Sequence, residues 1–199
     1  MNFATVVLPV QAHRVEANWF NVCIMVNIFI ENSKQLFHYY KTLGESALSQ
    51  LSEREIFQTG SEHDNSIAII MQHLAGNMLS RWTNFFTEDG EKSWRHRDKE
   101  FELQSDRYDE LLKYWERGWN CLFKALDEIT ADNIDQDVFI RAQKHNVTEA
   151  VQRQLTHYAY HIGQLVYIAK KMRGSQWNSL SIPKNKSSEF NTDRFTEDE

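Results

Sequence analysis

Three histidines have the residue type and spacing of a metal-binding group. His157 and His161 are four residues apart, so a helix would place both imidazoles on one face, about one turn apart. His73 lies in an earlier helical pattern and could supply a third ligand. Three neutral nitrogen ligands leave one position of a divalent ion open, as catalytic sites require and closed structural zinc sites do not. The sequence therefore predicts a metal site at these three histidines.

Three polar residues near these histidines are candidates for binding or catalysis. Asn77 follows His73 by four residues and Arg81 follows Asn77 by four, so all three would share one helix face. Asn77 could bind a substrate or orient a metal-bound water, and Arg81 could hold a carboxylate through two hydrogen bonds. Gln164 follows His161 by three residues and could orient that ligand. The alternatives are a buried amide at Asn77 and a salt-bridged structural arginine at Arg81.

The elements that must position these residues are predicted to be long helices. The 199 residues are 41% hydrophobic and include only 7 glycines and 2 prolines, which favours one all-α domain over many short strands. A long connection over residues 128–144, with a short turn or strand at residues 138–140, would precede the last helix. We therefore expect a four-helix bundle. Its helices are predicted at Val26–Leu51, Ser66–Phe86, Ser105–Asp127 and from Asn146 to just before Gly174.

Local signals define the ends and close contacts of these helices. Ser105 is a candidate N-cap, and Asn146 with Glu149 has the pattern of a capping box. Gly174 is typical of a helix stop. Glycines inside a helix cost stability, so Gly118 and Gly163 suggest close approach of a neighbouring element there.

Three regions are expected along the chain. Residues 1–26 lack clear periodicity and form an N-terminal extension, which we expect to be poorly ordered. Met25 just precedes the first clear helical pattern, so one hypothesis places the natural start there. Residues 27–174 form the helical domain, and residues 175–199 are predicted to be an irregular tail.

Composition argues against several functional classes. The 22 basic and 28 acidic residues give a net charge of −6, and no basic stripe suited to nucleic acid is present. No stretch approaches the roughly 20 apolar residues of a membrane span. Cys23 and Cys121 form no disulfide framework or CxxC motif, which favours a reducing cytoplasm. We therefore expect no nucleic-acid partner and no membrane partner.

Three stretches of this chain resemble the DinB-like family of bacterial four-helix bundles. They are residues 65–82, which contain His73, residues 89–98, and residues 153–164, which contain the other two histidines; Trp177 and residues 180–183 add to the likeness. The resemblance spans residues 27–191. It implies a metal site with one histidine from the second helix and two from the fourth, which His73, His157 and His161 match one by one. It also implies pairing through helix faces, so a homodimer is one expected assembly.

The resemblance leaves three functions open. Some DinB-like proteins are similar to transferases that use low-molecular-weight thiols, which would make this chain a thiol S-transferase with zinc or nickel. A metal-dependent hydrolase is the second alternative, although no carboxylate base is evident between His157 and His161. A non-enzymatic metal-binding or stress-related protein is the third. The charged segment Glu88–Glu100 could cover the site through Trp94, Arg95 and Arg97, or could be a solvated loop.

Overall fold

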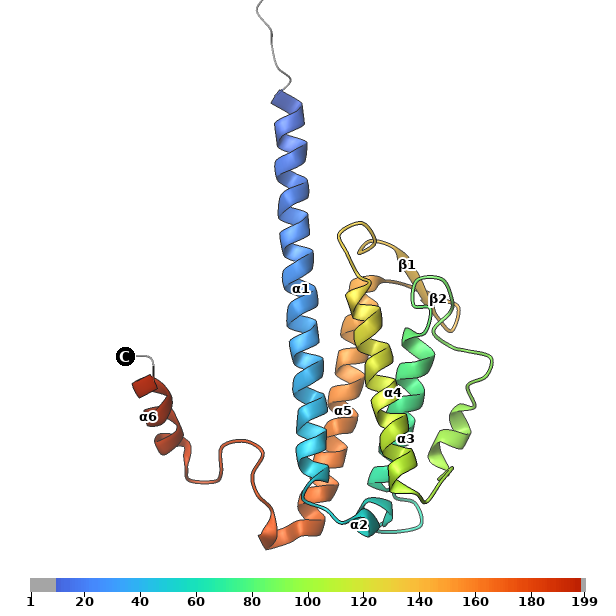
Figure 1. The fold of residues 1–199 in the computed structure, drawn as a ribbon, viewed down its shortest axis with the longest axis vertical. Coiled ribbons are helices and arrows are strands. Elements are labelled where there is room, and N and C mark those ends of the chain that lie inside the picture. Colours follow the sequence, from blue (N-terminus) through green and yellow to red (C-terminus); the bar gives the residue numbers. More distant parts are fainter. Residues whose placement is uncertain (1–9, 198–199) are drawn as a thin grey trace, which may run out of the picture.

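Four long helices lie alongside one another with roughly aligned axes (Figure 1). The computed structural model describes the backbone of residues 10–197 and the side chains of residues 19–192. Within that part the chain is predominantly helical, with one small antiparallel sheet, which is consistent with the expected all-α class. The long helices are α1 (Val10–Leu48), α3 (Ile67–Trp82), α4 (Tyr108–Asp127) and α5 (Val147–Arg173). The short elements are α2 (Glu53–Phe57), the 3₁₀ helices η1 (Arg97–Phe101) and η2 (Gly174–Gln176), the strands β1 (Asp137–Ile140) and β2 (Gln143–Asn146), and α6 (Ser187–Glu197).

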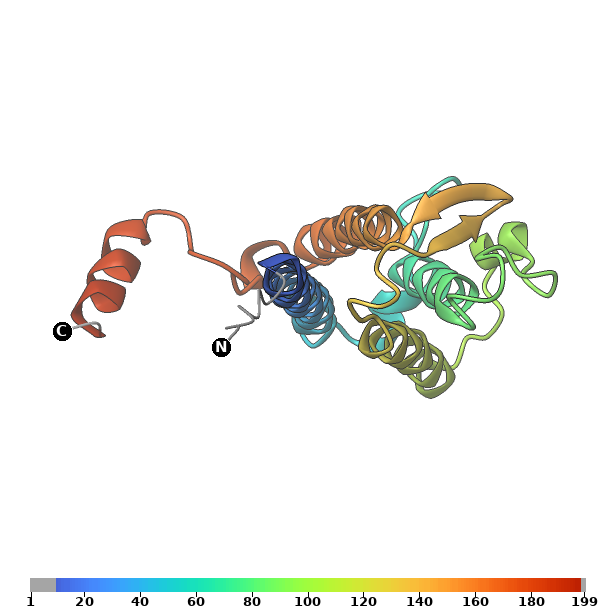
Figure 2. The same ribbon diagram turned by 90° about the horizontal axis from the view of Figure 1, so that it is seen from above.

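Helix α3 is the most buried element of the structure. Every residue of α3 except Leu79 is buried. It packs against α4, α5 and η1, whereas α1 packs against α5 and α4 (Figure 2). One face of α3 contributes Met71, Leu74 and Met78 to the apolar core. The other face carries polar side chains, and these need partners from the rest of the chain.

The predicted signals at the two ends of α5 are confirmed, and α3 begins where the sequence predicts, with a cap that the sequence did not single out. Ser66 caps α3 by accepting a hydrogen bond from the Ile69 backbone amide at 3.2 Å. Asn146 and Glu149 form the expected capping box at the start of α5. Gly174 ends α5 with a φ of +53°, a conformation that glycine adopts without the steric cost of a side chain.

Other predicted boundaries are wrong. Helix α3 ends at Trp82 rather than Phe86. Helix α4 begins at Tyr108, because the Ser105 hydroxyl accepts from the Arg107 backbone amide in a local turn and caps no helix. Helix α1 begins at Val10, so residues 10–26 of the predicted extension are helical, while residues 1–9 lie outside the described residues.

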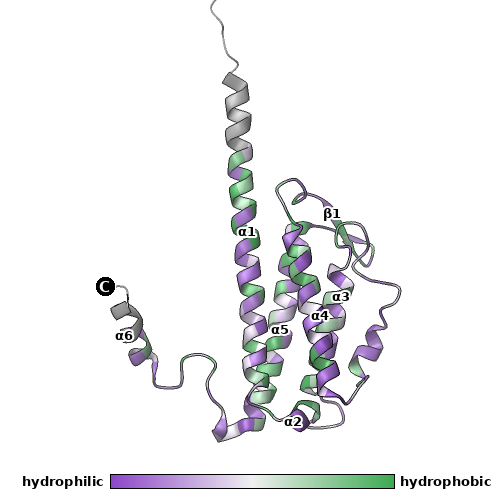
Figure 3. Cartoon of the chain, in the orientation of Figure 1, coloured by the Kyte–Doolittle hydropathy of each residue, from purple (hydrophilic) through white to green (hydrophobic). Residues whose placement is uncertain are grey.

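The first part of α1 projects beyond the other helices (Figure 1). Apolar residues occur along this part among polar ones (Figure 3). Trp19, Phe20, Met25 and Ile28 are each at least half exposed there. Because little packs against this segment, its apolar residues do not form a single stripe. The helix start that is predicted from an apolar stripe therefore lies too late in the chain.

The connection between α4 and α5 contains the expected strand, as part of a hairpin. Strands β1 and β2 pair antiparallel, with Ile140 opposite Gln143. The two residues between them, Arg141 and Ala142, have φ values of +57° and +58°. Such values are strained for residues with a β-carbon, and Asp89 holds the turn by accepting from both backbone amides at 2.8 and 2.7 Å.

The C-terminal region differs from the predicted irregular tail. Residues 187–197 form α6, which lies apart from the packed helices (Figures 1 and 2). No helix among the described residues is both long and apolar enough to cross a lipid bilayer.

Two helix glycines have opposite surroundings. A β-carbon at Gly118 of α4 would lie 2.9 Å from the Cα atom of Ala75 in α3, so the expected close approach is confirmed at this position. At Gly163 of α5, the expectation is wrong, because nothing lies within 4 Å of a β-carbon there.

These surroundings predict opposite effects of alanine substitution. Gly118→Ala should lower the free energy of unfolding by about 1–3 kcal/mol, because α3 and α4 must separate. Gly163→Ala should raise it by up to about 1 kcal/mol through helix propensity alone. Urea unfolding of the two variants and the wild type measures both effects. Equal stabilisation by both substitutions would contradict the close contact between α3 and α4.

Candidate metal centre

The structure brings the three predicted histidines together. His73 comes from α3, whereas His157 and His161 come from successive turns of α5. The Nε2 atoms of His73 and His157 lie 3.4 Å apart, and one nitrogen from each of the three rings lies within 4.8 Å of the others. Two nitrogens bound tetrahedrally to one zinc ion lie about 3.3 Å apart, given bonds of about 2.0–2.1 Å. The group could therefore hold one metal ion with little rearrangement.

A buried carboxylate orients His73. The Nδ1 atom of His73 donates to Oε2 of Glu100 at 2.8 Å, and Glu100 is 8% exposed. Burial alone would raise the pKa of Glu100, but hydrogen bonds from His73 and Arg95 and the charge of Arg95 hold it below its ordinary value. Glu100 is therefore an ionised acceptor, so in the neutral form of His73 the ring proton lies on Nδ1, facing this carboxylate. The lone pair on Nε2 is left free to bind a metal.

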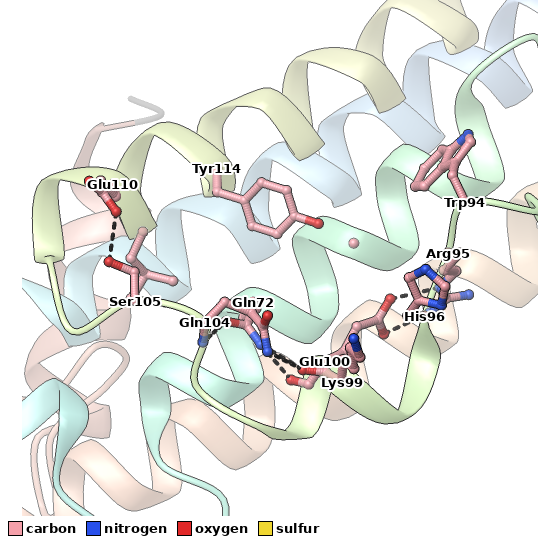
Figure 4. Close-up of a pocket in the computed structure, with 12 residues that line it drawn as sticks. Gln72, Trp94, Arg95, His96, Lys99, Glu100, Gln104, Ser105, Glu110 and Tyr114 are labelled. Atoms are coloured by element: carbon pink, nitrogen blue, oxygen red, sulfur yellow. Dashed lines mark hydrogen bonds and ion pairs between the residues drawn. The ribbon is translucent and has the colours of Figure 1, made fainter.

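Arg95 and Gly76 keep Glu100 in this position. Arg95 donates to the two carboxylate oxygens from Nε and Nη2, at 2.7 and 2.9 Å. This ion pair also faces a second cavity of about 410 Å³, where the Tyr114 ring lies nearby (Figure 4). A β-carbon at Gly76 would lie 2.7 Å from Oε1 of Glu100, so only glycine leaves room for the carboxylate.

Gln164 orients His161 in the same way. The Nδ1 atom of His161 lies 2.8 Å from Oε1 of Gln164, whose Nε2 donates to the Tyr160 hydroxyl. An amide oxygen only accepts, so neutral His161 carries its proton on Nδ1 and its Nε2 lone pair is free. Gln164 thus contacts the ligand that the sequence assigns to it, and a catalytic role for Gln164 stays a prediction.

Two of the histidines are held neutral. Burial and the charges of His161 and His73 lower the pKa of His157 to about 3. Burial and the charge of His73 also lower the pKa of His161, against the opposing effect of Gln164. Metal ligation needs neutral imidazole, so near neutral pH both rings are already in the binding form.

Asn77 is a buried amide, 5% exposed, in the wall of the cavity beside the histidines. The hydroxyl of buried Tyr158 accepts from Nε1 of Trp82 at 3.0 Å, so its own proton goes to Oδ1 of Asn77 at 3.1 Å. The side-chain NH₂ group of Asn77 is its remaining hydrogen-bonding group. This arrangement suits the predicted contact with a substrate.

Arg81 is engaged by the loop rather than free. It donates from Nη1 to the Gly90 carbonyl and from Nη2 to Oε2 of Glu91 at 3.0 Å. Arg81 is 6% exposed, so it matches the salt-bridged alternative better than a free carboxylate clamp.

The segment Glu88–Glu100 forms a wall of the site instead of a solvated loop. Lys92, Arg95 and Glu100 are all buried, and η1, which begins within this segment, packs on α3. Arg95 and Arg97 line the cavity with the histidines, whereas Trp94 lines the second cavity.

The cavity beside the histidines has a volume of about 440 Å³. Its other polar walls come from η1, the hairpin turn and α5. The sequence pattern missed several residues at or next to this cavity. They are Glu91, Glu100, Arg141, Arg153 and Gln154. The carboxylates and Arg141 have partners far away in the chain, whereas the other two lie within four residues of His157 on α5.

A family model matches residues 25–186 of the chain. The chain belongs to this family, which is described as a protein of unknown function (DUF1572). No curated protein and no solved structure matches the chain. Membership in this family assigns no activity to the site. The resemblance to DinB-like proteins stays a prediction.

The low pKa of His157 predicts acid sensitivity in this DUF1572 member. In the unfolded chain this histidine takes up a proton below about pH 6.5, whereas in the folded chain it stays neutral down to about pH 3. Acid therefore favours the unfolded chain. The free energy of unfolding of metal-free protein should fall between pH 6.5 and pH 5, by at most about 1.4 kcal/mol per pH unit from this group.

Urea unfolding of chelator-treated protein at several pH values tests this effect. His157→Gln should show a shallower decline than the wild type, and His63→Gln, at an exposed position, should match the wild type. Identical slopes for the wild type and His157→Gln would contradict the assigned pKa.

Proposed function

We propose that the chain binds one divalent metal ion through His73, His157 and His161 and transfers a low-molecular-weight thiol to an electrophile. The observation that carries this proposal is the convergence of three imidazoles on one point, two of them oriented by Glu100 and Gln164. Oriented, neutral nitrogen ligands are what a transition metal requires. Zinc and nickel both suit three imidazoles.

The ligand set supports a site with open coordination. Three ligands leave room for a small molecule, and a bound ion would lower the pKa of a thiol or water placed there. The cavity of about 440 Å³ lies next to the histidines, so a small molecule could reach that position. Asn77 would hold it through an amide hydrogen bond.

The carboxylates near the site favour a thiol over water as the nucleophile. Glu100 is paired with Arg95, and Glu91 with Arg81 and Arg141. Burial would raise the pKa of Glu91, but Arg141 and Arg81 hold it below its ordinary value, as Arg95 and His73 do for Glu100. Carboxylates with a lowered pKa are weak bases. Hydrolysis needs a general base to activate water, whereas thiol transfer needs one less, because a thiol already ionises near pH 8.5.

The arrangement of the helices supports the same proposal. Helices α1, α3, α4 and α5 would form the DinB-like four-helix bundle, with one ligand on the second long helix and two on the fourth. Cys23 and Cys121 are unpaired, which fits a reducing cytoplasm where small thiols stay reduced. Assembly as a homodimer belongs to this proposal.

Elemental analysis of untagged protein tests metal binding. The wild type should carry about one equivalent of zinc or nickel, and His157→Ala should carry none, because two nitrogens hold the ion poorly. His63→Ala is the matched control and should keep the metal. A wild type that takes up no metal after reconstitution would contradict the proposal. If metal-loaded protein consumes no bacterial thiol in the presence of standard electrophiles, the metal-binding part of the proposal stands and the transfer part is contradicted.

Glu100→Gln tests the orienting role of that carboxylate. The substitution keeps the shape but removes the charge that polarises His73, so metal affinity should fall about 10- to 100-fold. Competition with a chromophoric chelator measures the affinity. Glu110→Gln is the control, because Glu110 lines the second cavity and contacts Ser105 rather than a histidine. Equal metal affinity in both variants would remove Glu100 from the site.

A further inference from the structure

The cavity beside the histidines is strongly cationic, although the chain as a whole carries a net charge of −6. Five arginines line it, and their carboxylate partners are only Glu91 and Glu100 among the described residues. Positive charge therefore exceeds negative charge by three among these groups, and by two when Asp89, which lies within reach of the charge of Arg81, is added. Like charges gathered at one place repel one another, so this arrangement favours a negatively charged occupant.

Arg81 and Arg95 already bind other groups of the protein, but one donor atom of Arg95 has no acceptor. Arg81 is bound to Gly90 and Glu91, and Arg95 is bound to Glu100. The Nη1 atom of Arg95 is buried without a hydrogen-bond partner, 3.6 Å from the nearest oxygen of Glu91. A buried donor without an acceptor is costly, so a ligand acceptor at this point would be stabilising.

Two further arginines are unpaired and lie close to the metal ligands. Within the part of the chain that the structure describes, Arg97 and Arg153 form no ion pair. The Arg97 guanidinium lies over the Phe101 ring at 5.5 Å, and that ring stacks on His73 at 5.0 Å. Arg153 precedes His157 by four residues on α5, so both lie on one helix face.

The fifth arginine is placed at the cavity by the strained hairpin turn. Arg141 and Ala142 both have positive φ values, a conformation that costs about 1 kcal/mol or more for each residue. Asp89 supports the turn through two backbone amides, and Arg141 donates from Nε to Glu91 at 3.0 Å. A two-residue hairpin turn has positive φ at both central residues, and Asp89 and Glu91 thereby fix where Arg141 lies beside the cavity.

Gln154 adds an unused acceptor to the same cavity. It is 3% exposed, and its Oε1 atom is buried without a hydrogen-bond partner. Gln154 and Arg95 both line the cavity, so it offers an unsatisfied acceptor and an unsatisfied donor as well as free positive charge.

We infer that this cavity binds a small molecule with at least two anionic groups, carboxylate or phosphate, through Arg97, Arg141 and Arg153. Guanidinium groups pair with both kinds of anion through two parallel hydrogen bonds. The volume of about 440 Å³ fits a small molecule. This inference deepens the proposed function, on which it rests, because it specifies the charge of the molecule that reaches the histidines.

Calorimetric titration tests the anion site directly. Succinate and inorganic phosphate are titrated separately into chelator-treated protein and into zinc-loaded protein, with neutral succinamide as the uncharged counterpart. At least one anion should bind both forms, and succinamide should bind neither. The double variant Arg97→Gln/Arg153→Gln should weaken anion binding by about tenfold or more, because it removes two charge-assisted contacts. The tighter of the two anions identifies the chemical class.

Controls separate this inference from the metal proposal. Arg107→Gln removes an exposed arginine that does not line the cavity, and it should leave anion binding unchanged. Zinc content should be equal in the wild type and the double variant. Anion binding that is absent, or that survives in the double variant while zinc still binds, would overturn the inference. Arginine-dependent anion binding in a chain that takes up no metal would overturn the proposed function alone.

Discussion

The hydrogen bond between buried His73 and buried Glu100 organises the rest of the site. Helix α3 lies at the centre of the packed helices, where an unpaired charge would cost several kcal/mol. Glu100 is acceptable there only because His73 and Arg95 both donate to it. Arg95 in turn requires the segment after α3 to fold back over the helix. One polar contact thus fixes a ligand, an ion pair and the path of a loop.

The same requirement explains why the loop and the hairpin have few alternatives. Arg81 is buried on α3 and needs acceptors, which Gly90 and Glu91 supply. Glu91 also accepts from Arg141, so the hairpin is joined to the loop through a shared carboxylate. Asp89 bonds to the hairpin turn through the backbone. Gly90 and Glu91 thus satisfy an arginine that would otherwise be buried without acceptors, whereas Arg141 joins the hairpin to the loop from a half-exposed position.

Much of the helical framework could be predicted from local signals. The caps at Ser66 and Asn146 depend on contacts three residues apart, and the spacing of His157 and His161 depends only on helix geometry. Glu100 could not be predicted, because it lies in a charged segment whose partner is 27 residues away. The wrong expectations at Ser105 and Gly163 have a related cause. A serine or a glycine has a local conformational preference that the sequence reveals. The contacts it makes in the folded chain depend on residues that are far away in the sequence.

Placement of the ligands also bears on how the chain folds. His73 and His157 are 84 residues apart in sequence and belong to helices that face each other. An ion that joins them closes a loop containing the charged segment, α4 and the hairpin, much as a disulfide would. Because the unfolded chain holds these ligands far apart, only the folded chain binds the ion well. At free metal a thousandfold above Kd, this linkage would add about 4 kcal/mol to the free energy of unfolding, so metal supply would set how much of the chain is folded.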